Sequence, residues 1–191
     1  MVGTLDARQT GSVSGGPSFS LRNRIVRLVW GATWILACSW TPRGLRAWRS
    51  FVLKLFGAKI GYRSDVRGSA QIWLPANLTM GDRSILAEGV NCYNMAEIKI
   101  GCDVIISQRS HLCGGTHDFN DPNFQLLSRP IVVEDNVWIA AEAFVGPGVS
   151  IGEGVVLGAR SVAFSNLKPW TIYAGNPAKP IRDRSLSGRR G

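Results

Sequence analysis

The sequence predicts an all-β fold, a left-handed parallel β-helix with an N-terminal helical arm and an inserted catalytic loop. Bulky apolar residues recur every six positions, small residues recur four positions after them, and glycine often follows the apolar residue. This pattern is typical of a parallel β-helix, in which each hexapeptide forms one flat side of a triangular coil. Bulky side chains then fill the interior, while small residues and Gly form the tight corners. The apolar series runs through Ile60, Val66, Ile72, Leu78, Met80, Leu86, Cys92, Ile98, Ile100, Ile106, Leu112, Val133, Ile139, Val145, Ile151 and Leu157.

The residues that begin successive coils set the coil length. Ile60, Met80 and Ile100 are evenly spaced, Val133 follows after a much longer interval, and Ile151 then follows after an interval close to the first ones. Stacked coils pair as parallel strands, so the excess of roughly 13–15 residues in the long coil must leave it as a loop. An ordinary sandwich would instead show alternating residues with variable turns. We expect the β-helix to span 58–182.

The inserted loop, 113–130, is where the sequence predicts chemistry. It contains His117, one of two histidines in the chain, beside Asp118. A regular repeat that pauses for a polar segment commonly does so for function. Histidine suits proton transfer because its ordinary pKa, roughly 6.5, leaves the imidazole mostly neutral at pH 7. We expect His117 to be a general base that Asp118 could orient; the alternative is a solvated loop histidine that makes a local turn.

The segment 19–57 is predicted to form a Trp-rich helical arm. Its first apolar stretch, Ile25–Trp40, is too short to span a bilayer comfortably, since a membrane helix needs about 20 apolar residues. On a second helix, over Leu45–Phe56, the basic residues are expected to lie on the side away from the apolar ones. The basic residues of this helix are Arg46, Arg49 and Lys54. Two interpretations of the arm remain open, an interfacial membrane hairpin and packing on the β-helix or on a neighbouring subunit.

The basic charge belongs to the two ends of the chain. Of the net charge of +9, residues 1–59 carry +8, residues 60–180 carry −2 and residues 181–191 carry +3. A nucleic-acid-binding domain would place positive charge on its folded body, so no nucleic-acid partner is expected. Basic ends around a neutral body fit an anionic membrane surface better. The outermost parts are predicted to be a disordered leader, 1–18, and a basic tail, 183–191.

The four cysteines show neither a CxxC pair nor a metal-ligand spacing. We therefore expect reduced, mostly packed thiols. With two histidines in the whole chain, the three-histidine zinc site of the β-helical carbonic anhydrases is not expected, and no metal is predicted.

Three segments together carry a family resemblance. They are the loop GGTHDFNDP, the following PIVVEDNVWI and the closing AGNPAK. The combination resembles the hexapeptide acyltransferases, and within them the maltose/galactoside O-acetyltransferase branch. The Trp-rich arm, the AEGVNCYN coil and the THDFNDP loop are similar, more narrowly, to colanic-acid-type polysaccharide acetyltransferases. The resemblance covers residues 19–182.

The resemblance implies a homotrimer whose active sites lie between adjacent β-helices, with acetyl-CoA in the cleft and His117 as the base. The implied reaction is O-acetylation of a sugar hydroxyl in extracellular or surface polysaccharide biosynthesis. Alternatives are a non-catalytic membrane-associated trimeric scaffold and an N-acetyltransferase acting on an amino sugar. The arm favours a lipid-linked glycan as acceptor, and the acetyl-CoA supply implies a cytoplasmic location, possibly at the inner face of the cytoplasmic membrane. The implied cofactor-binding residues are Trp138, Ala140, Ala141, Gly158, Ala159, Gly175, Asn176, Pro177 and Lys179, and the implied substrate-binding residues are Glu88, Asn91, Tyr93 and Asp118.

Overall fold

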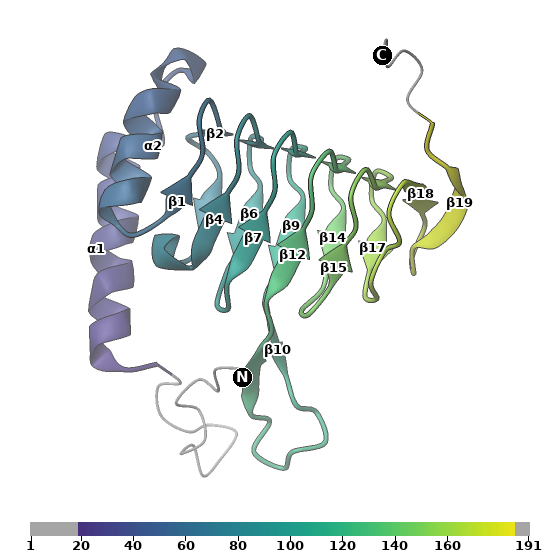
Figure 1. Cartoon of the computed structure of the whole chain (residues 1–191). Coiled ribbons are helices and arrows are strands. Elements are labelled where there is room, and N and C mark those ends of the chain that lie inside the picture. The colour runs from purple at the N-terminus through teal and green to yellow at the C-terminus, as the bar shows by residue number, and fades with distance from the viewer. Residues whose placement is uncertain (1–18, 186–191) are drawn as a thin grey trace.

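A computed structural model describes residues 19–185. The predicted leader, 1–18, and the end of the predicted tail, 186–191, lie outside the described residues. The coils of a parallel β-helix stack along one axis, two helices cross its N-terminal end, and a hairpin projects from one side (Figure 1).

Each of the five complete coils contributes one strand to each of three sheets, and these coils are followed by β18 and β19, which both belong to the second sheet. The first sheet contains β1 (Lys59–Ile60), β4 (Leu78–Met80), β7 (Ile98–Ile100), β12 (Ile131–Val133) and β15 (Ser150–Ile151). The second contains β2 (Asp65–Val66), β5 (Ile85–Leu86), β8 (Ile105–Ile106), β13 (Trp138–Ile139), β16 (Val156–Leu157), β18 (Thr171–Ala174) and β19 (Lys179–Asp183). The third contains β3 (Gln71–Ile72), β6 (Asn91–Tyr93), β9 (His111–Cys113), β14 (Phe144–Val145) and β17 (Val162–Ala163). A short 3-10 helix, Pro75–Asn77, precedes β4.

The strand register confirms the coil lengths predicted from the sequence. Met80 pairs with Ile60 on one side and with Ile100 on the other, so the first two coils are equal in length. Val133 pairs with both Ile100 and Ile151, so one long coil is followed by a coil of nearly the ordinary length. The extra residues of the long coil leave between β9 and β12, where the sequence places the loop.

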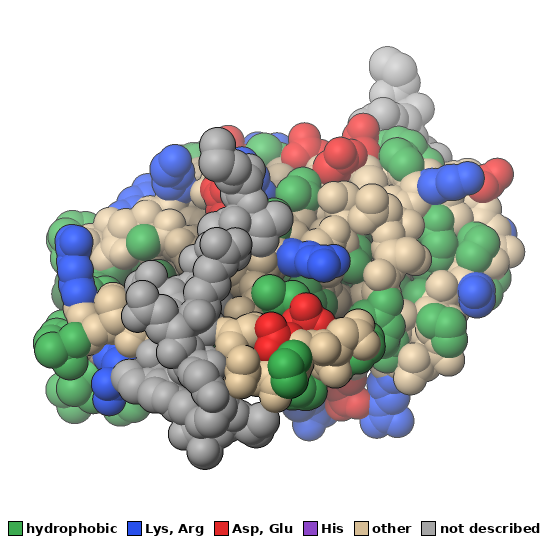
Figure 2. Space-filling model, turned by 90° about the horizontal axis from the view of Figure 1, so that it is seen from below, with side chains coloured by type: hydrophobic (Ala, Val, Ile, Leu, Met, Phe, Trp, Pro, Cys, Tyr) green, Lys and Arg blue, Asp and Glu red, His purple; other side chains and the backbone are tan. Residues whose placement is uncertain are grey.

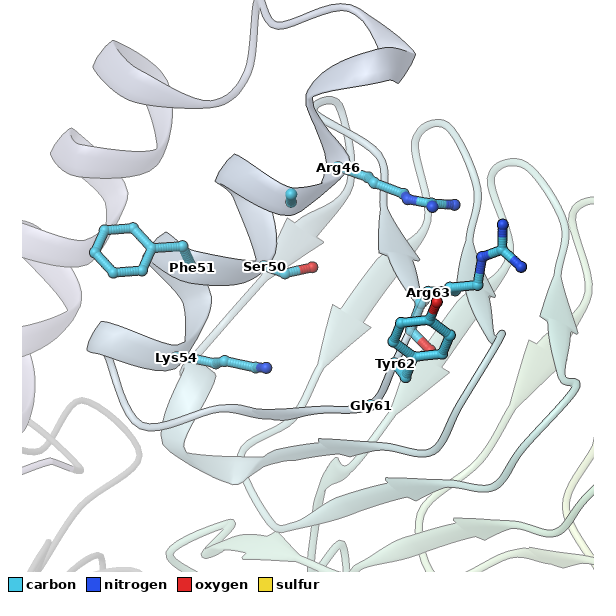
Figure 3. Close-up of a pocket in the computed structure, with 9 residues that line it drawn as sticks. Arg46, Ser50, Phe51, Lys54, Gly61, Tyr62 and Arg63 are labelled. Carbon is cyan, nitrogen blue, oxygen red and sulfur yellow. The ribbon is translucent and has the colours of Figure 1, made fainter.

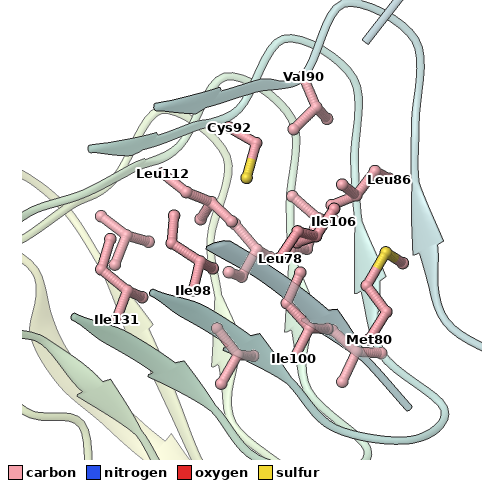
Figure 4. Close-up of a cluster of buried hydrophobic side chains, with 14 of the residues drawn as sticks. Leu78, Met80, Leu86, Val90, Cys92, Ile98, Ile100, Ile106, Leu112 and Ile131 are labelled. Atoms are coloured by element: carbon pink, nitrogen blue, oxygen red, sulfur yellow. The ribbon is translucent and has the colours of Figure 1, made fainter. Parts of the chain in front are cut away.

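The interior of the β-helix is the predicted apolar series, and none of its members is more than 6% exposed. These side chains meet across the triangular coil (Figure 4). At the corners, Ser84 and Ser110 are fully buried, and their hydroxyls donate to the carbonyl oxygens of Gly101 and Ala140 at 2.6 and 2.9 Å. A small hydroxyl therefore fits the corner and also satisfies a carbonyl in the next coil.

The helical cap, residues 19–57, covers the open end of the first coil. It consists of α1 (Leu21–Ala37), a 3-10 turn (Arg43–Leu45) and α2 (Arg46–Leu55). Trp30 and Trp34 are buried, and their indole N–H groups donate to carbonyl oxygens of the first coil, that of Ile72 at 2.6 Å and those of Gly68 and Ala70 at 3.0 and 3.1 Å. One face of the arm thus packs on the β-helix, because it satisfies backbone acceptors that the end coil leaves unpaired.

The prediction for the sides of α2 was wrong at Arg49. Arg49 is fully buried, with its guanidinium 2.9 Å from Asp65 Oδ1 and donating to the carbonyl oxygens of Val66 and Pro42 at 2.8 and 2.7 Å. Helical spacing alone cannot distinguish a solvated arginine from one that enters a polar cavity, and here the partners come from the neighbouring coil. Conversely, Trp48 and Leu55 are exposed.

The ends of the fold and the cysteines add three facts. β19 and Arg184, whose guanidinium donates to the carbonyl oxygens of Asn136 and Gly154, extend the folded region beyond 182 into the predicted tail. All four cysteines are free thiols, as predicted, and Cys38 and Cys92 are buried. Among residues 19–185, no helix is both long and apolar enough to cross a membrane.

Candidate active site

The inserted loop is an antiparallel hairpin of β10 (Gly115–His117) and β11 (Leu126–Ser128). Its base is held to the coil by Gly114 N–H, which donates to the carbonyl oxygen of Tyr93 at 2.9 Å. A Cβ at position 115 would overlap Met95 Sδ and would lie 2.9 Å from a ring carbon of Tyr93. A side chain at this position would therefore have to displace Met95 and Tyr93, and glycine lets the hairpin leave the coil without that shift.

His117 ends the first strand of the hairpin and is exposed. Its Nδ1 lies 2.8 Å from the carbonyl oxygen of Phe124, and its ring stacks on the Phe124 ring with centroids 4.9 Å apart. A carbonyl oxygen can only accept, so this contact assigns the proton of the neutral imidazole to Nδ1. Nε2 then carries a free lone pair, as a general base requires.

Asp118 shapes the turn of the hairpin. Its backbone N–H donates to the carbonyl oxygen of Gln125 at 2.8 Å, and its Oδ1 accepts from the backbone N–H of Asn120 at 3.0 Å. The contact that orients the imidazole, which the sequence suggested for Asp118, is thus made by the Phe124 carbonyl. Nothing in the sequence distinguishes that carbonyl, because every residue carries one.

Most of the predicted cofactor-binding residues lie at one corner of the β-helix, where the chain passes from the second sheet to the third. Ala140 N–H donates to the carbonyl oxygen of Leu157 and Gly158 N–H to that of Tyr173, each at 2.8 Å. These bonds stack successive corners one above the next along the axis. We call this row the corner strip; it consists of Ala140, Ala141, Gly158, Ala159 and Gly175.

The remaining predicted cofactor-binding residues lie beside the corner strip. Trp138 begins the strand before it, is 46% exposed, and donates its indole N–H to Ser107 Oγ at 3.0 Å. Asn176 and Pro177, joined by a cis peptide bond, form the exposed turn between β18 and β19, and exposed Lys179 follows. The side chains along the strip are therefore small, and a cation that could pair with an anionic group lies at its end.

The third sheet carries the predicted acceptor residues Asn91 and Tyr93. Asn91 lies beside His111 in the register, and the Tyr93 ring contacts the His111 ring at 6.5 Å. His111 also contacts Phe144 at 5.3 Å, and burial lowers its pKa. Burial likewise raises the pKa of Tyr93. This aromatic row was not predicted, although Trp73 and Tyr93 occupy equivalent positions in successive coils and could have indicated it. Their rings lie 6.0 Å apart.

Glu88 contacts the helical cap. Its carboxylate lies 2.8 Å from the Arg43 guanidinium and 3.7 Å from that of Arg67. A hydrogen bond from its own backbone, with Arg43 adding to it, lowers the pKa of Glu88. The acceptor role expected of Glu88 would therefore compete with an ion pair that ties the cap to the coils.

The fold of the single chain keeps the two parts of the candidate site apart. The hairpin with His117 leaves the corner between the third and first sheets, whereas the corner strip lies between the second and third. The hairpin also points away from the coils (Figure 1). Within the described part of the chain, no group of three or more His, Cys, Asp or Glu side chains could hold a metal ion.

The hexapeptide repeat of the coils matches a known class of transferases. The family model for bacterial transferase hexapeptide (six repeats) matches residues 130–163. The chain is 43% identical over 162 residues to the putative colanic acid biosynthesis acetyltransferase WcaF of Escherichia coli, covering 85% of this chain and 89% of that one. The chain therefore belongs to the hexapeptide-repeat acetyltransferase family.

Solved structures show the same fold. A hexapeptide-repeat acetyltransferase from Vibrio cholerae, solved with acetyl coenzyme A, superposes with a TM-score of 0.80 at 24% identity, covering 87% of this chain and 91% of that one. A maltose O-acetyltransferase from Clostridium difficile superposes with a TM-score of 0.79 at 22% identity, covering 87% and 90%.

Proposed function

We propose that this acetyltransferase moves an acetyl group from acetyl-CoA to a sugar hydroxyl, with His117 as the general base. The observation that carries the proposal is the hydrogen bond between His117 Nδ1 and the Phe124 carbonyl, which leaves Nε2 free in an exposed position. Nε2 takes the hydroxyl proton as the oxygen attacks the thioester carbonyl. The new C–O bond forms, the C–S bond breaks, and the imidazolium returns the proton to the leaving thiolate. Backbone N–H groups of the coil or hairpin would stabilise the oxyanion.

The relatives support the donor and the acceptor class. The Vibrio cholerae structure holds acetyl coenzyme A, and the Escherichia coli relative is named for colanic acid biosynthesis. We accordingly assign acetyl-CoA to the corner strip, with Trp138 at the thioester end and Lys179 near the nucleotide phosphates. The proposed acceptor is a sugar that is used in polysaccharide biosynthesis. The side chains proposed to contact it are those of Asn91, Tyr93 and Asp118.

The separation of the two corners supports a homotrimer. In a cyclic trimer each interface joins two different surfaces, so the hairpin of one protomer can meet the corner strip of the next. Each active site then takes His117 from one copy and its cofactor-binding residues from another. The basic N-terminal segment favours a lipid-linked glycan as the acceptor. Such an acceptor would be acetylated at the cytoplasmic face of the membrane, where acetyl-CoA is available.

Release of CoA from acetyl-CoA in the presence of a panel of sugars tests the proposal. The panel contains neutral sugars, amino sugars and lipid-linked glycans, and compares the wild type with His117→Ala. We expect acceptor-dependent release by the wild type, and a loss of about 100- to 10,000-fold in the variant with acetyl-CoA binding retained. Equal rates would refute the role of His117, transfer to amino sugars alone would indicate N-acetylation, and absence of acetyl-CoA binding would leave the scaffold interpretation.

A further inference from the structure

The helical cap has an outward face that the fold leaves uncovered. On α1, Leu28 and Leu36 are 74% and 76% exposed, and they lie on the side of the helix away from Trp30 and Trp34, which pack on the first coil. On α2, Phe51 and Leu55 are 52% and 67% exposed. The surfaces of soluble proteins usually carry exposed apolar side chains singly, so a group of large ones on two neighbouring helices indicates an interaction site.

The charges around this face have one sign. Residues 19–59 contain eight Lys or Arg and no Asp or Glu. Arg43 and Arg49 are paired with acids of the β-helix, Glu88 and Asp65. The end of the molecule that carries α1 and α2 accordingly shows green apolar and blue basic side chains (Figure 2).

A basic hollow lies at the edge of the apolar face. Arg46, Ser50 and Lys54 of α2 line it on one side, and Tyr62 and Arg63 of the first coil line it on the other (Figure 3). Its volume is about 460 Å³, and no acid lines it. None of its three cations forms an ion pair with another described residue. Its lining therefore offers three cations without ion pairs and the hydroxyls of Ser50 and Tyr62, which are groups that bind phosphate, and its volume leaves room for a phosphate group.

We propose that the outward face of the helical cap docks on a lipid bilayer that contains anionic lipid, with lipid headgroup phosphates held in the hollow of Arg46, Lys54 and Arg63. Apolar side chains of amphipathic helices enter the headgroup boundary while cations on the flanks attract anionic lipid. We assign this face to a bilayer for two reasons. It combines exposed leucines with positive charge, as a membrane-binding helix does, and residues 19–59 contain no acid that could pair with a basic protein surface. The proposal is independent of the acetyl transfer proposed above.

Vesicle flotation with the full chain tests the docking surface. We compare vesicles of phosphatidylcholine with vesicles that also contain phosphatidylglycerol. The variants are Leu28→Ser with Leu36→Ser, for the apolar face, and Arg46→Gln with Lys54→Gln and Arg63→Gln, for the hollow. Point variants are preferred to truncation, because removing the cap would expose the first coil that Trp30 and Arg49 cover.

We expect the wild type to bind the anionic vesicles, and to bind them less as salt rises. The charge variant should lose on the order of 100-fold in affinity for the anionic vesicles, about fivefold for each cation. The serine variant should also lose binding to these vesicles. Matched controls at the far end of the β-helix, Phe164→Ser (66% exposed) and Lys168→Gln, should bind as the wild type does. Absence of wild-type binding, or equal binding by the variants, would overturn the proposal. If the wild type does not bind vesicles and the serine variant forms a smaller oligomer, the face would be assigned to contact with a second copy of the chain, and the proposal would be overturned.

Discussion

The coils and the hairpin that interrupts them use their residues in opposite ways. In the coils, many apolar side chains have the same environment, and all of those in the interior series are at most 6% exposed. In the hairpin, one exposed histidine is held by one carbonyl and one ring. The stability of the molecule therefore depends on the repeat and on the cap that covers its first coil, whereas the proposed chemistry depends on the hairpin. Changes in one region should leave the property of the other region intact.

Removal of the hairpin should have the largest effect on activity. The chain contains its own shorter link between the third and first sheets, residues 94–97, which joins β6 to β7. Replacing 114–130 by that sequence should abolish turnover, a fall of at least about 100-fold, because the general base is lost. The free energy of unfolding should change by no more than about 1–2 kcal/mol, since loop length has a weak effect. Steady-state CoA release and urea unfolding measure the two quantities, and loss of the fold would contradict the separation of scaffold and chemistry.

Arg49→Met should have the largest effect on stability. It leaves Asp65, which is 6% exposed, without one of its two arginines, and it removes the donors to Val66 and Pro42. Breaking a buried ion pair on one side typically costs about 3–5 kcal/mol. Arg46→Met, on the same helix but exposed, should change the free energy of unfolding by no more than about 0.5 kcal/mol. Equal effects in urea unfolding would show that Arg49 does not seal the first coil.

Trp34→Phe should have a smaller effect on the same sealed end. An aromatic six-membered ring remains, but the carbonyl oxygens of Gly68 and Ala70 lose their indole donor. An unsatisfied buried acceptor costs about 1–3 kcal/mol. The control is Trp40→Phe, because Trp40 is 70% exposed and bonds only within the cap. A smaller loss for Trp34 than for Trp40 in thermal unfolding would contradict the role of the indole N–H.

The smallest effect concerns pH. Burial lowers the pKa of His111 in the folded state, so the unfolded chain binds a proton first as the pH falls. Stability linked to His111 is therefore complete above its unfolded pKa of about 6.5 and decreases as the pH falls through that value toward the folded one. His111→Phe should reduce the difference in unfolding free energy between about pH 7.5 and about pH 5.5 relative to the wild type. Urea unfolding at the two pH values measures that difference, and an unchanged difference in the variant would contradict the assignment.

The coil lengths and the strand register could largely be predicted from the sequence. A six-residue period determines both which side chain points inward and which residue it pairs with one coil away. Ile60, Met80 and Ile100 illustrate this, since each is predicted and found one above the next. Partners between different kinds of element have no such period. The sequence therefore missed the burial of Arg49 and the Phe124 carbonyl behind His117, which depend on how a helix meets a coil and how a hairpin turns. It placed the corner-strip residues through resemblance, and the roles of those residues remain a proposal.

A subunit-mixing experiment tests the central claim, that the histidine of one protomer serves the corner strip of the next. His117→Ala is co-expressed with Ala159→Trp, which fills an exposed position of the strip, and mixed oligomers are isolated by two different tags. Each parent alone should be inactive. Every mixed cyclic trimer pairs an intact hairpin with an intact strip at one of its three sites, so about a third of wild-type turnover should return. If His117 and the corner strip of one site belonged to the same protomer, every protomer in a mixed oligomer would carry one damaged part and none would be active. Mixed oligomers that are as inactive as their parents would therefore contradict the shared active site.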